Sequence, residues 1–204
     1  MPYYGQDFML EDRCGQLTGS DFEDINDRVR LTLRCTQRES THTIYMIFDR
    51  TNSVVFNYNN PLAVLDFGPN NTLGTVSFKP GTTMPMKNYL SKLSGPFAKS
   101  TVRKFMAQDG QEYLWTYKTK PDQEWACTNA RGYPVASYNL KLYGEPEYQK
   151  SSGCMLTVDE TYPHLLAGML LLVLPAAESY ADILCSSEML ASLTIMRHIL
   201  AHNL

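Results

Sequence analysis

The sequence predicts a mainly β fold with C-terminal helices, and three observations lead to this prediction. Short runs of alternating apolar and polar residues follow one another from Arg28 to Tyr143. Turn-forming residues separate these runs at the spacing of β-hairpins. After Pro163 the chain becomes apolar without alternation, which is typical of enclosed helices. The most economical arrangement is an antiparallel sheet closed into a barrel around a C-terminal helix.

The first 27 residues show neither the strand nor the helix period. They are polar and acidic, so we expect an N-terminal arm over 1–27 and one domain over 28–204. The first strand is expected from Arg28 onward, because Val29, Leu31, Leu33 and Cys35 share one parity. Four arginines occupy the other parity and could bind phosphate, or could simply be exposed side chains of a sheet: Arg28, Arg30, Arg34 and Arg38.

Four hairpins are expected next. The first two join the strand pairs 43–49 with 53–58 and 63–68 with 72–78. In the third, over 102–118, Asp109-Gly110 predicts a type I′ turn with positive φ at both residues. The fourth spans 124–143, with Asn129 to Gly132 as its loop.

The C-terminal part predicts one more strand and two helices. The strand is expected over 154–159, and Pro163 and Pro175 delimit a helix that ends near Leu174. The apolar run 165–177 is too short to cross a bilayer, which takes about 18 residues or more. A final helix over 187–202 is apolar nearly all round, so it must be enclosed.

Three segments resemble a fungal family of uncharacterised domains, related in fold to the tubby C-terminal domain and the phospholipid scramblases. They are FMAQDGQEYLWTYK, EWACTNARGYPVASYNLK and the ending EMLASLTIMRHIL, and the similarity covers about residues 40–204. The resemblance implies a closed barrel of about 12 strands with the terminal helix through its middle. The extra apolar segment 164–185 departs from the family pattern. Tubby proteins bind phosphoinositides and scramblases act at membranes, but this fold hosts many functions.

The composition argues against one class of function and indicates a cellular location. The chain has 18 basic and 21 acidic residues and a net charge of −3, which argues against a dedicated nucleic-acid binder. Five cysteines without metal-type spacing indicate reduced thiols. The first residues lack the pattern of a secretory signal, so we expect a cytoplasmic protein that can associate with a membrane surface.

One basic stretch is the main indication in the sequence that the protein binds a partner. No acidic residue lies between Asp66 and Asp109, and the stretch has six basic residues: Lys79, Lys87, Lys92, Lys99, Arg103 and Lys104. Clustered basic residues attract anionic lipid at about 1 kcal/mol each. The alternative is a solvated face that pairs with the acidic residues 21–27.

Aromatic residues gather in the third and fourth hairpins. Tyr113, Trp115 and Tyr117 share one parity, and Trp125 lies in the next strand. Such a stripe can line a pocket for an apolar ligand, although cross-strand packing in the core is the more frequent arrangement.

Catalytic and metal-binding signals are sparse. His164 is a candidate acid/base group, with Asp159 and Glu160 nearby, or a residue that caps the following helix. His198 and His202 have metal-ligand spacing without a third ligand, so no metal or other cofactor is expected.

Three functional hypotheses follow. The favoured one is a barrel without catalysis that binds a lipid or apolar small molecule and could do so at an anionic membrane surface. The alternative is an isomerase or cyclase of fungal secondary metabolism that acts on an apolar substrate in a barrel or helix-lined cavity. A third is an interaction module, for example a homodimer through the apolar residues 165–174. The position of this helix distinguishes them, because a helix inside the barrel leaves little room for a substrate.

Overall fold

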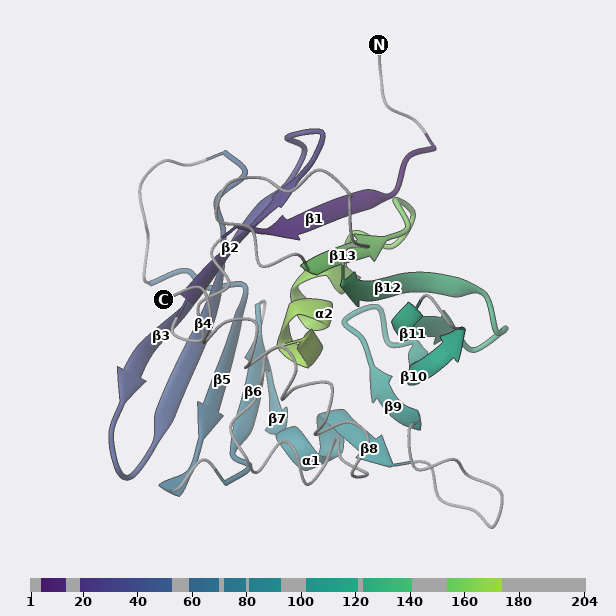
Figure 1. The fold of residues 1–204 in the computed structure, drawn as a ribbon. Coiled ribbons are helices and arrows are strands. Elements are labelled where there is room, and N and C mark those ends of the chain that lie inside the picture. Colours follow the sequence, from purple (N-terminus) through teal and green to yellow (C-terminus); the bar gives the residue numbers. More distant parts are fainter. Residues whose placement is uncertain are drawn as a thin grey trace.

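The computed structural model describes residues 5–13, 19–52, 59–69, 72–79, 81–92, 102–120, 123–140 and 154–173. In these ranges, 13 strands form one antiparallel sheet that two helices accompany, so the mainly β prediction is confirmed (Figure 1). The strands are β1 (Phe8–Asp12), β2 (Gly19–Asp24), β3 (Arg30–Arg38), β4 (Thr43–Asp49), β5 (Ala63–Phe67), β6 (Thr75–Phe78), β7 (Thr82–Pro85), β8 (Leu90–Lys92), β9 (Val102–Met106), β10 (Glu112–Lys120), β11 (Gln123–Asn129), β12 (Pro134–Leu140) and β13 (Cys154–Val158). The helices are α1 (Met86–Tyr89) and α2 (Leu165–Val173).

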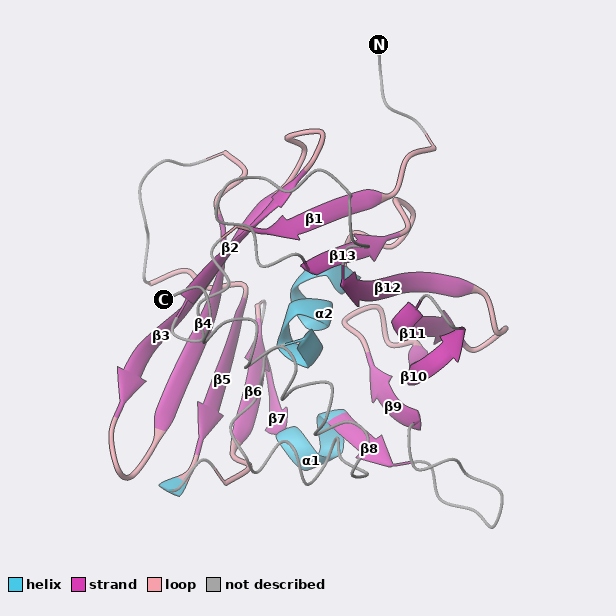
Figure 2. Cartoon of the chain, in the orientation of Figure 1, coloured by secondary structure: helices cyan, strands magenta, loops and turns pink. Residues whose placement is uncertain are grey.

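The sheet curves around α2 but remains open at one seam (Figure 2). Its order is β7-β6-β5-β4-β3-β2-β1-β13-β12-β11-β10-β9-β8, and the edge strands β7 and β8 form no ladder with each other in the described part of the chain. The short helix α1 connects these two edges and contacts both of them. The closed barrel expected from the sequence is therefore not confirmed.

The prediction of an N-terminal arm over residues 1–27 is wrong. Residues 8–12 and 19–24 form β1 and β2, which join the two ends of the meander: β1 pairs with β13, and β2 pairs with β3. Leu10 and Phe22 enter the core, but the buried positions of these strands also include Ser20, Asp12 and Asp24. The Ser20 hydroxyl donates a hydrogen bond to Asp12. Polar residues at buried positions hide the alternation that normally reveals a strand.

The hairpins β5–β6, β9–β10 and β11–β12 are confirmed, but the predicted type I′ turn is wrong. At the β9–β10 turn, Gly110 has a φ of 73°, whereas Asp109 does not have a positive φ. The N–H of Gly110 donates to the carbonyl of Ala107, and the N–H of Ala107 donates to that of Gln111. This is a three-residue loop that ends in a left-handed glycine. The β11–β12 loop repeats it, with Gly132 at a φ of 79°.

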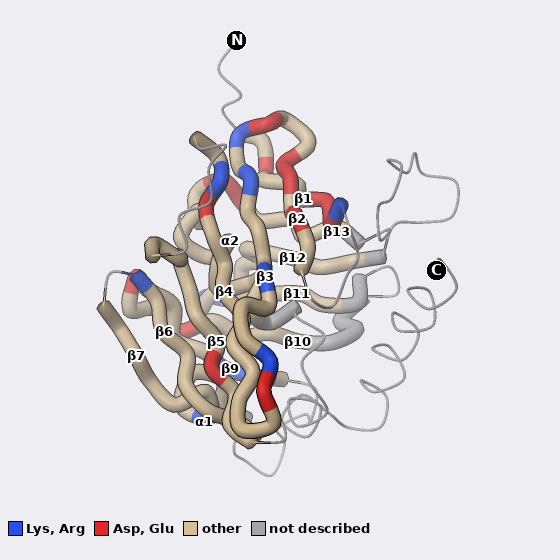
Figure 3. The backbone as a smooth tube through the Cα atoms, turned by 90° about the vertical axis from the view of Figure 1, so that its left-hand side faces the viewer, with Lys and Arg blue, Asp and Glu red and all other residues tan. Residues whose placement is uncertain are grey.

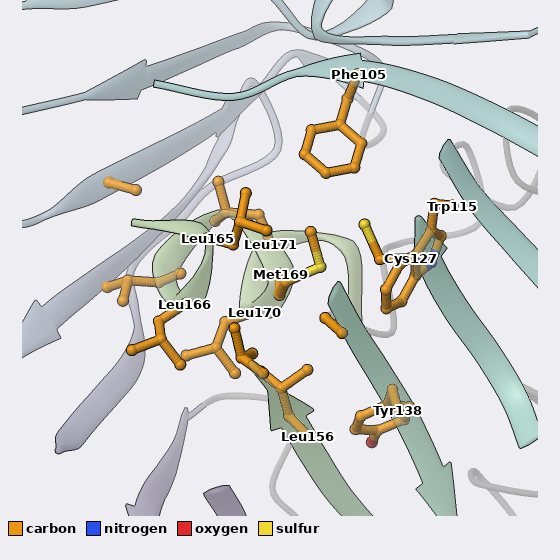
Figure 4. Close-up of a cluster of buried hydrophobic side chains, with 14 of the residues drawn as sticks. Phe105, Trp115, Cys127, Tyr138, Leu156, Leu165, Leu166, Met169, Leu170 and Leu171 are labelled. Carbon is orange, nitrogen blue, oxygen red and sulfur yellow. The ribbon is translucent and has the colours of Figure 1, made fainter. Parts of the chain in front are cut away.

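The helix α2 fills the concave side of the sheet. Its residues Leu165 to Leu171, apart from Gly168, are at most 9% exposed, and all of these except Ala167 join a core cluster with side chains from both halves of the sheet. Figure 4 shows Met169 pointing from α2 toward Cys127 and Trp115. A helix that is apolar all round requires such enclosure. The strand expected over 53–58 and the helix expected over 187–202 lie outside the described residues.

One hypothesis from the sequence is a homodimer that forms through the apolar residues 165–174. Over residues 165–171 the chain itself covers these side chains, so they form no exposed apolar strip for a second copy to contact.

Candidate functional site

Three ionisable side chains meet where the chain enters α2. The Tyr113 hydroxyl donates to Asp109 Oδ2 at 2.7 Å, and His164 Nε2 lies 3.1 Å from the same oxygen. Tyr113 Oη and His164 Nε2 are 3.4 Å apart. The side chains of Asp109 and His164 are each 28% exposed, so solvent reaches the edge of this cluster.

The fold assembles the cluster from separate parts of the chain. Asp109 lies in the β9–β10 turn, Tyr113 lies on β10, and His164 follows Pro163 immediately before α2. A second link lies beside the first, since Asn129 Nδ2 of the β11–β12 hairpin donates to Tyr162 Oη at 3.1 Å. The two hairpins are thereby tied to the beginning of the buried helix.

The electrostatics favour an ionised carboxylate beside a neutral phenol. Burial alone would raise the pKa of Asp109, but the Gln111 N–H, the Tyr113 hydroxyl and His164 stabilise the carboxylate and hold its pKa below the ordinary value. Burial and the adjacent Asp109 carboxylate raise the pKa of Tyr113 strongly. Chemically, the cluster offers a carboxylate that orients an imidazole and a phenol that donates a hydrogen bond.

The expected neighbours of His164 have other partners. Asp159 Oδ1 accepts hydrogen bonds from the N–H and the hydroxyl of Thr161, and so forms the turn before α2. Glu160 Oε1 accepts a hydrogen bond from the N–H of Gly5. Asp109 was not predicted as the partner of His164, because in the sequence Asp109-Gly110 reads as a turn.

The aromatic stripe lies in the core. Tyr113 and Trp115 are each 1% exposed and Trp125 is 7% exposed, and the two indoles stack with centroids 5.7 Å apart. The indole N–H of Trp115 is buried without an acceptor in the described part of the chain. The Tyr117 side chain lies outside the described residues. This burial supports the core-packing alternative.

Only part of the basic stretch 79–104 lies on the protein surface. Arg103 is 1% exposed and lies on the inward-facing side of β9, so the prediction that it contacts lipid at the surface is wrong. Lys104 Nζ lies 2.6 Å from Glu112 Oε1, and Lys87 is exposed on α1. The Lys92 side chain and Lys99 lie outside the described residues.

Within the described residues, the ion pairs of the acidic segment 21–27 are with arginines. Arg28 donates from Nε and a terminal nitrogen to the two carboxylate oxygens of Asp24, at 2.7 and 3.1 Å. Arg34 pairs with Asp21 and Arg30 with Asp27. Arg38 donates to the Tyr45 hydroxyl. Figure 3 shows acidic and basic residues close together on this side of the sheet. The sheet-face alternative for Arg28, Arg34 and Arg38 is therefore the better one.

Three large apolar side chains protrude from the described part of the chain. Tyr133 in the β11–β12 loop is 68% exposed, Met106 at the end of β9 is 51% exposed, and Ile25 in the β2–β3 turn is 44% exposed. The register places Met106 opposite Glu112 on β10, and Tyr113 opposite Asn129. Met106 and Tyr133 therefore lie on neighbouring hairpins, about three strand spacings or 14 Å apart.

One polar pocket of about 340 Å³ opens on the outer face of β2 and β3 and the turn after β4. Its lining residues are Asp21, Glu23, Arg30, Leu31, Thr32, Arg50, Thr51 and Asn52. Within the described residues, no three histidine, cysteine or acidic side chains gather as metal ligands would, and no helix is long and apolar enough to cross a bilayer.

Comparison with known proteins places the chain in a family. A model described as "Family of unknown function (DUF6593)" matches residues 26–173, which is more than half of the chain. The chain belongs to the DUF6593 family. The match begins after β2, although β1 and β2 are integral to the sheet of this DUF6593 domain. No curated protein and no solved structure matches it.

Proposed function

We propose that the domain binds the surface of an anionic membrane, without catalysis, through a docking surface made of the two hairpin ends and α1. The observation that carries this proposal is that α2 occupies the interior while Tyr133 and Met106 protrude. An apolar ligand would have to displace α2 side chains to enter the core, whereas a lipid surface needs only what is already exposed. Cytoplasmic location, barrel closure and kinship with the tubby and scramblase folds remain predictions.

Charge supports the same surface. Lys87 is exposed on α1, which contacts β9, and Arg131 is exposed beside Tyr133. Each basic residue near an anionic membrane contributes about 1 kcal/mol. Tyrosine suits the interface because its ring is apolar and its hydroxyl remains hydrated. The docking surface thus combines apolar side chains with the cations Lys87 and Arg131, and the carboxylates at the β9–β10 hairpin end, Asp109 and Glu112, lie against His164 and Lys104.

Vesicle co-sedimentation of the full chain tests the proposal. We expect binding to phosphatidylcholine vesicles that contain phosphatidylserine and none to phosphatidylcholine alone. The double variant Lys87→Glu/Arg131→Glu should bind about 10- to 30-fold more weakly at low salt, from about 1 kcal/mol per lost cation. This difference should shrink at high salt, which screens exposed charges.

Matched controls identify the surface. Met106→Ser/Tyr133→Ser should weaken binding at both salt concentrations, whereas Ile25→Ser, which removes the third protruding side chain, should not. Lys79→Glu changes a charge in the β6–β7 turn and should have a smaller effect than Lys87→Glu. Absence of binding to anionic vesicles, or equal losses in all variants, would refute the docking surface.

A second candidate function, acid–base catalysis, is favoured by the contact of Asp109 with Tyr113 and His164. Untargeted mass spectrometry of a small-molecule extract incubated with native protein or with His164→Gln tests it. A compound that disappears only with native protein supports catalysis, and identical profiles argue against it.

A further inference from the structure

The polar pocket on the outer face of the sheet has a composition that points to its ligand. Its side chains include two carboxylates, two guanidinium groups, the hydroxyls of Thr32 and Thr51, and one amide. The only aliphatic lining residue, Leu31, is 3% exposed and belongs to the core. The pocket of about 340 Å³ is at the lower end of the size range of small-molecule sites. A polar small molecule fits these walls, whereas an acyl chain does not.

The charges of the pocket are divided between its two sides. Asp21 and Glu23 come from β2, and Arg50 comes from the turn after β4. β3 lies between them and contributes Arg30 and Thr32. Arg50 is therefore separated from the acidic residues by about two strand spacings, roughly 10 Å before the side chains reach inward, and Arg30 lies between them, in register with Glu23.

Hydrogen bonds and ion pairs orient these groups. Asp21 Oδ1 accepts from Thr32 Oγ1 and from Arg34, each at 2.8 Å. Glu23 lies 3.2 Å from Arg13 Nε. On the basic side, the Arg50 N–H donates to the carbonyl of Arg30, and the Arg30 N–H donates to Thr51 Oγ1. The two sides are thus built on a rigid ladder, which favours a ligand of defined charge separation.

We propose that this pocket binds a small zwitterion, with its ammonium group toward Asp21 and Glu23 and its carboxylate or phosphate toward Arg30 and Arg50. Charge-assisted hydrogen bonds to both ends make a zwitterion the best match. A simple anion would meet two carboxylates at one side, and a simple cation would meet two guanidinium groups at the other. This site is independent of the membrane-docking surface.

An NMR titration of the full-length, ¹⁵N-labelled chain tests the proposal with four probes: O-phosphoethanolamine, β-alanine, inorganic phosphate and ethylammonium. We expect at least one zwitterion to shift the backbone amide signals of Thr32 and Thr51, and each probe that carries charge of one sign only to bind about tenfold more weakly. The difference between O-phosphoethanolamine and β-alanine shows whether phosphate or carboxylate is preferred. Equal binding of phosphate alone, or no shift with either zwitterion, would overturn the assignment.

Two variants test the two sides of the pocket. Arg30→Gln and Glu23→Gln should each weaken zwitterion binding about tenfold, because each removes one charge-assisted contact. Arg38→Gln changes the same residue type on the same strand, outside the pocket, and should bind as the native chain does. Far-UV circular dichroism confirms folding of each variant. Unchanged affinity in both pocket variants would place the ligand elsewhere.

Discussion

Replacing Met169 by alanine tests whether α2 is the packed centre of the fold. Met169 is 0% exposed and belongs to the same core cluster as Trp115 and Cys127. The substitution removes three heavy atoms from the core. At about 0.8 kcal/mol for each buried group, the lost transfer free energy is about 2.4 kcal/mol. The cavity left behind adds to this cost, so we expect a loss of about 3 kcal/mol, within the range of about 2–5 kcal/mol for such changes.

Urea unfolding followed by tryptophan fluorescence measures the effect, because Trp115 and Trp125 both lie in this core. In a protein of this size, 1 kcal/mol corresponds to about 2–4 °C in melting temperature, so Met169→Ala should melt about 6–12 °C lower.

The matched control is Met106→Ala, the same substitution at a side chain that is 51% exposed on β9. Its free energy of unfolding should stay within about 0.5 kcal/mol of the native value. If Met169→Ala loses less than about 1 kcal/mol, the helix does not pack as described. The case for an interior without room for a ligand would then fail.

Three further predictions concern single side chains. Asp24→Asn should destabilise the fold by about 3–5 kcal/mol in urea titrations, because it leaves Arg28 without its buried carboxylate. Gly74→Ala should cost more than about 2 kcal/mol, because a Cβ there would lie 1.9 Å from the carbonyl oxygen of Asp66, and a normal melting temperature would contradict this close approach. Cys127 should react with a thiol reagent far more slowly than Cys35, because burial raises the pKa of the Cys127 thiol, and equal rates would contradict its burial.

The ion pair between Asp24 and Arg28 also predicts that the stability of the fold depends on pH. Burial alone would raise the pKa of Asp24, but hydrogen bonds from Arg28 and from the N–H groups of Met9 and Arg28 hold it below the ordinary value. A lowered folded-state pKa stabilises the fold above the unfolded-state value of about 3.9, and this stabilisation is lost as the pH falls through the folded-state value. Native stability should therefore fall more steeply below about pH 4 than that of Asp24→Asn. If the stability of the native chain and that of Asp24→Asn changed with pH in the same way, the lowered pKa of Asp24 would be contradicted.

Local patterns predicted the meander because each hairpin carries its own turn residues. Asp109-Gly110 and Asn129 to Gly132 mark two loops that the structure contains. The turn type was wrong because the presence of Asp-Gly does not fix loop length, and here only the glycine adopts positive φ.

The candidate site could not be predicted, because it depends on register between distant strands. Asp109 and His164 meet only when β13 pairs with β12 and directs the chain back toward the β9–β10 turn. The nearby acidic residues Asp159 and Glu160 looked like better partners because they are close in sequence. β1 and β2 were not predicted because polar side chains occupy buried positions on them, where hydrogen bonds within residues 12–28 satisfy them and hide the alternation.

The position of α2 is the basis for both proposed binding sites. Because the interior of the described part of the chain is packed, both proposals place binding on its outer surface. The docking surface has protruding apolar side chains, whereas the pocket on β2 and β3 is polar. Lys87→Glu/Arg131→Glu should therefore leave zwitterion binding intact, and Arg30→Gln should leave vesicle binding intact. If either variant set abolished both activities, a common structural change would explain the losses, and neither surface could be assigned.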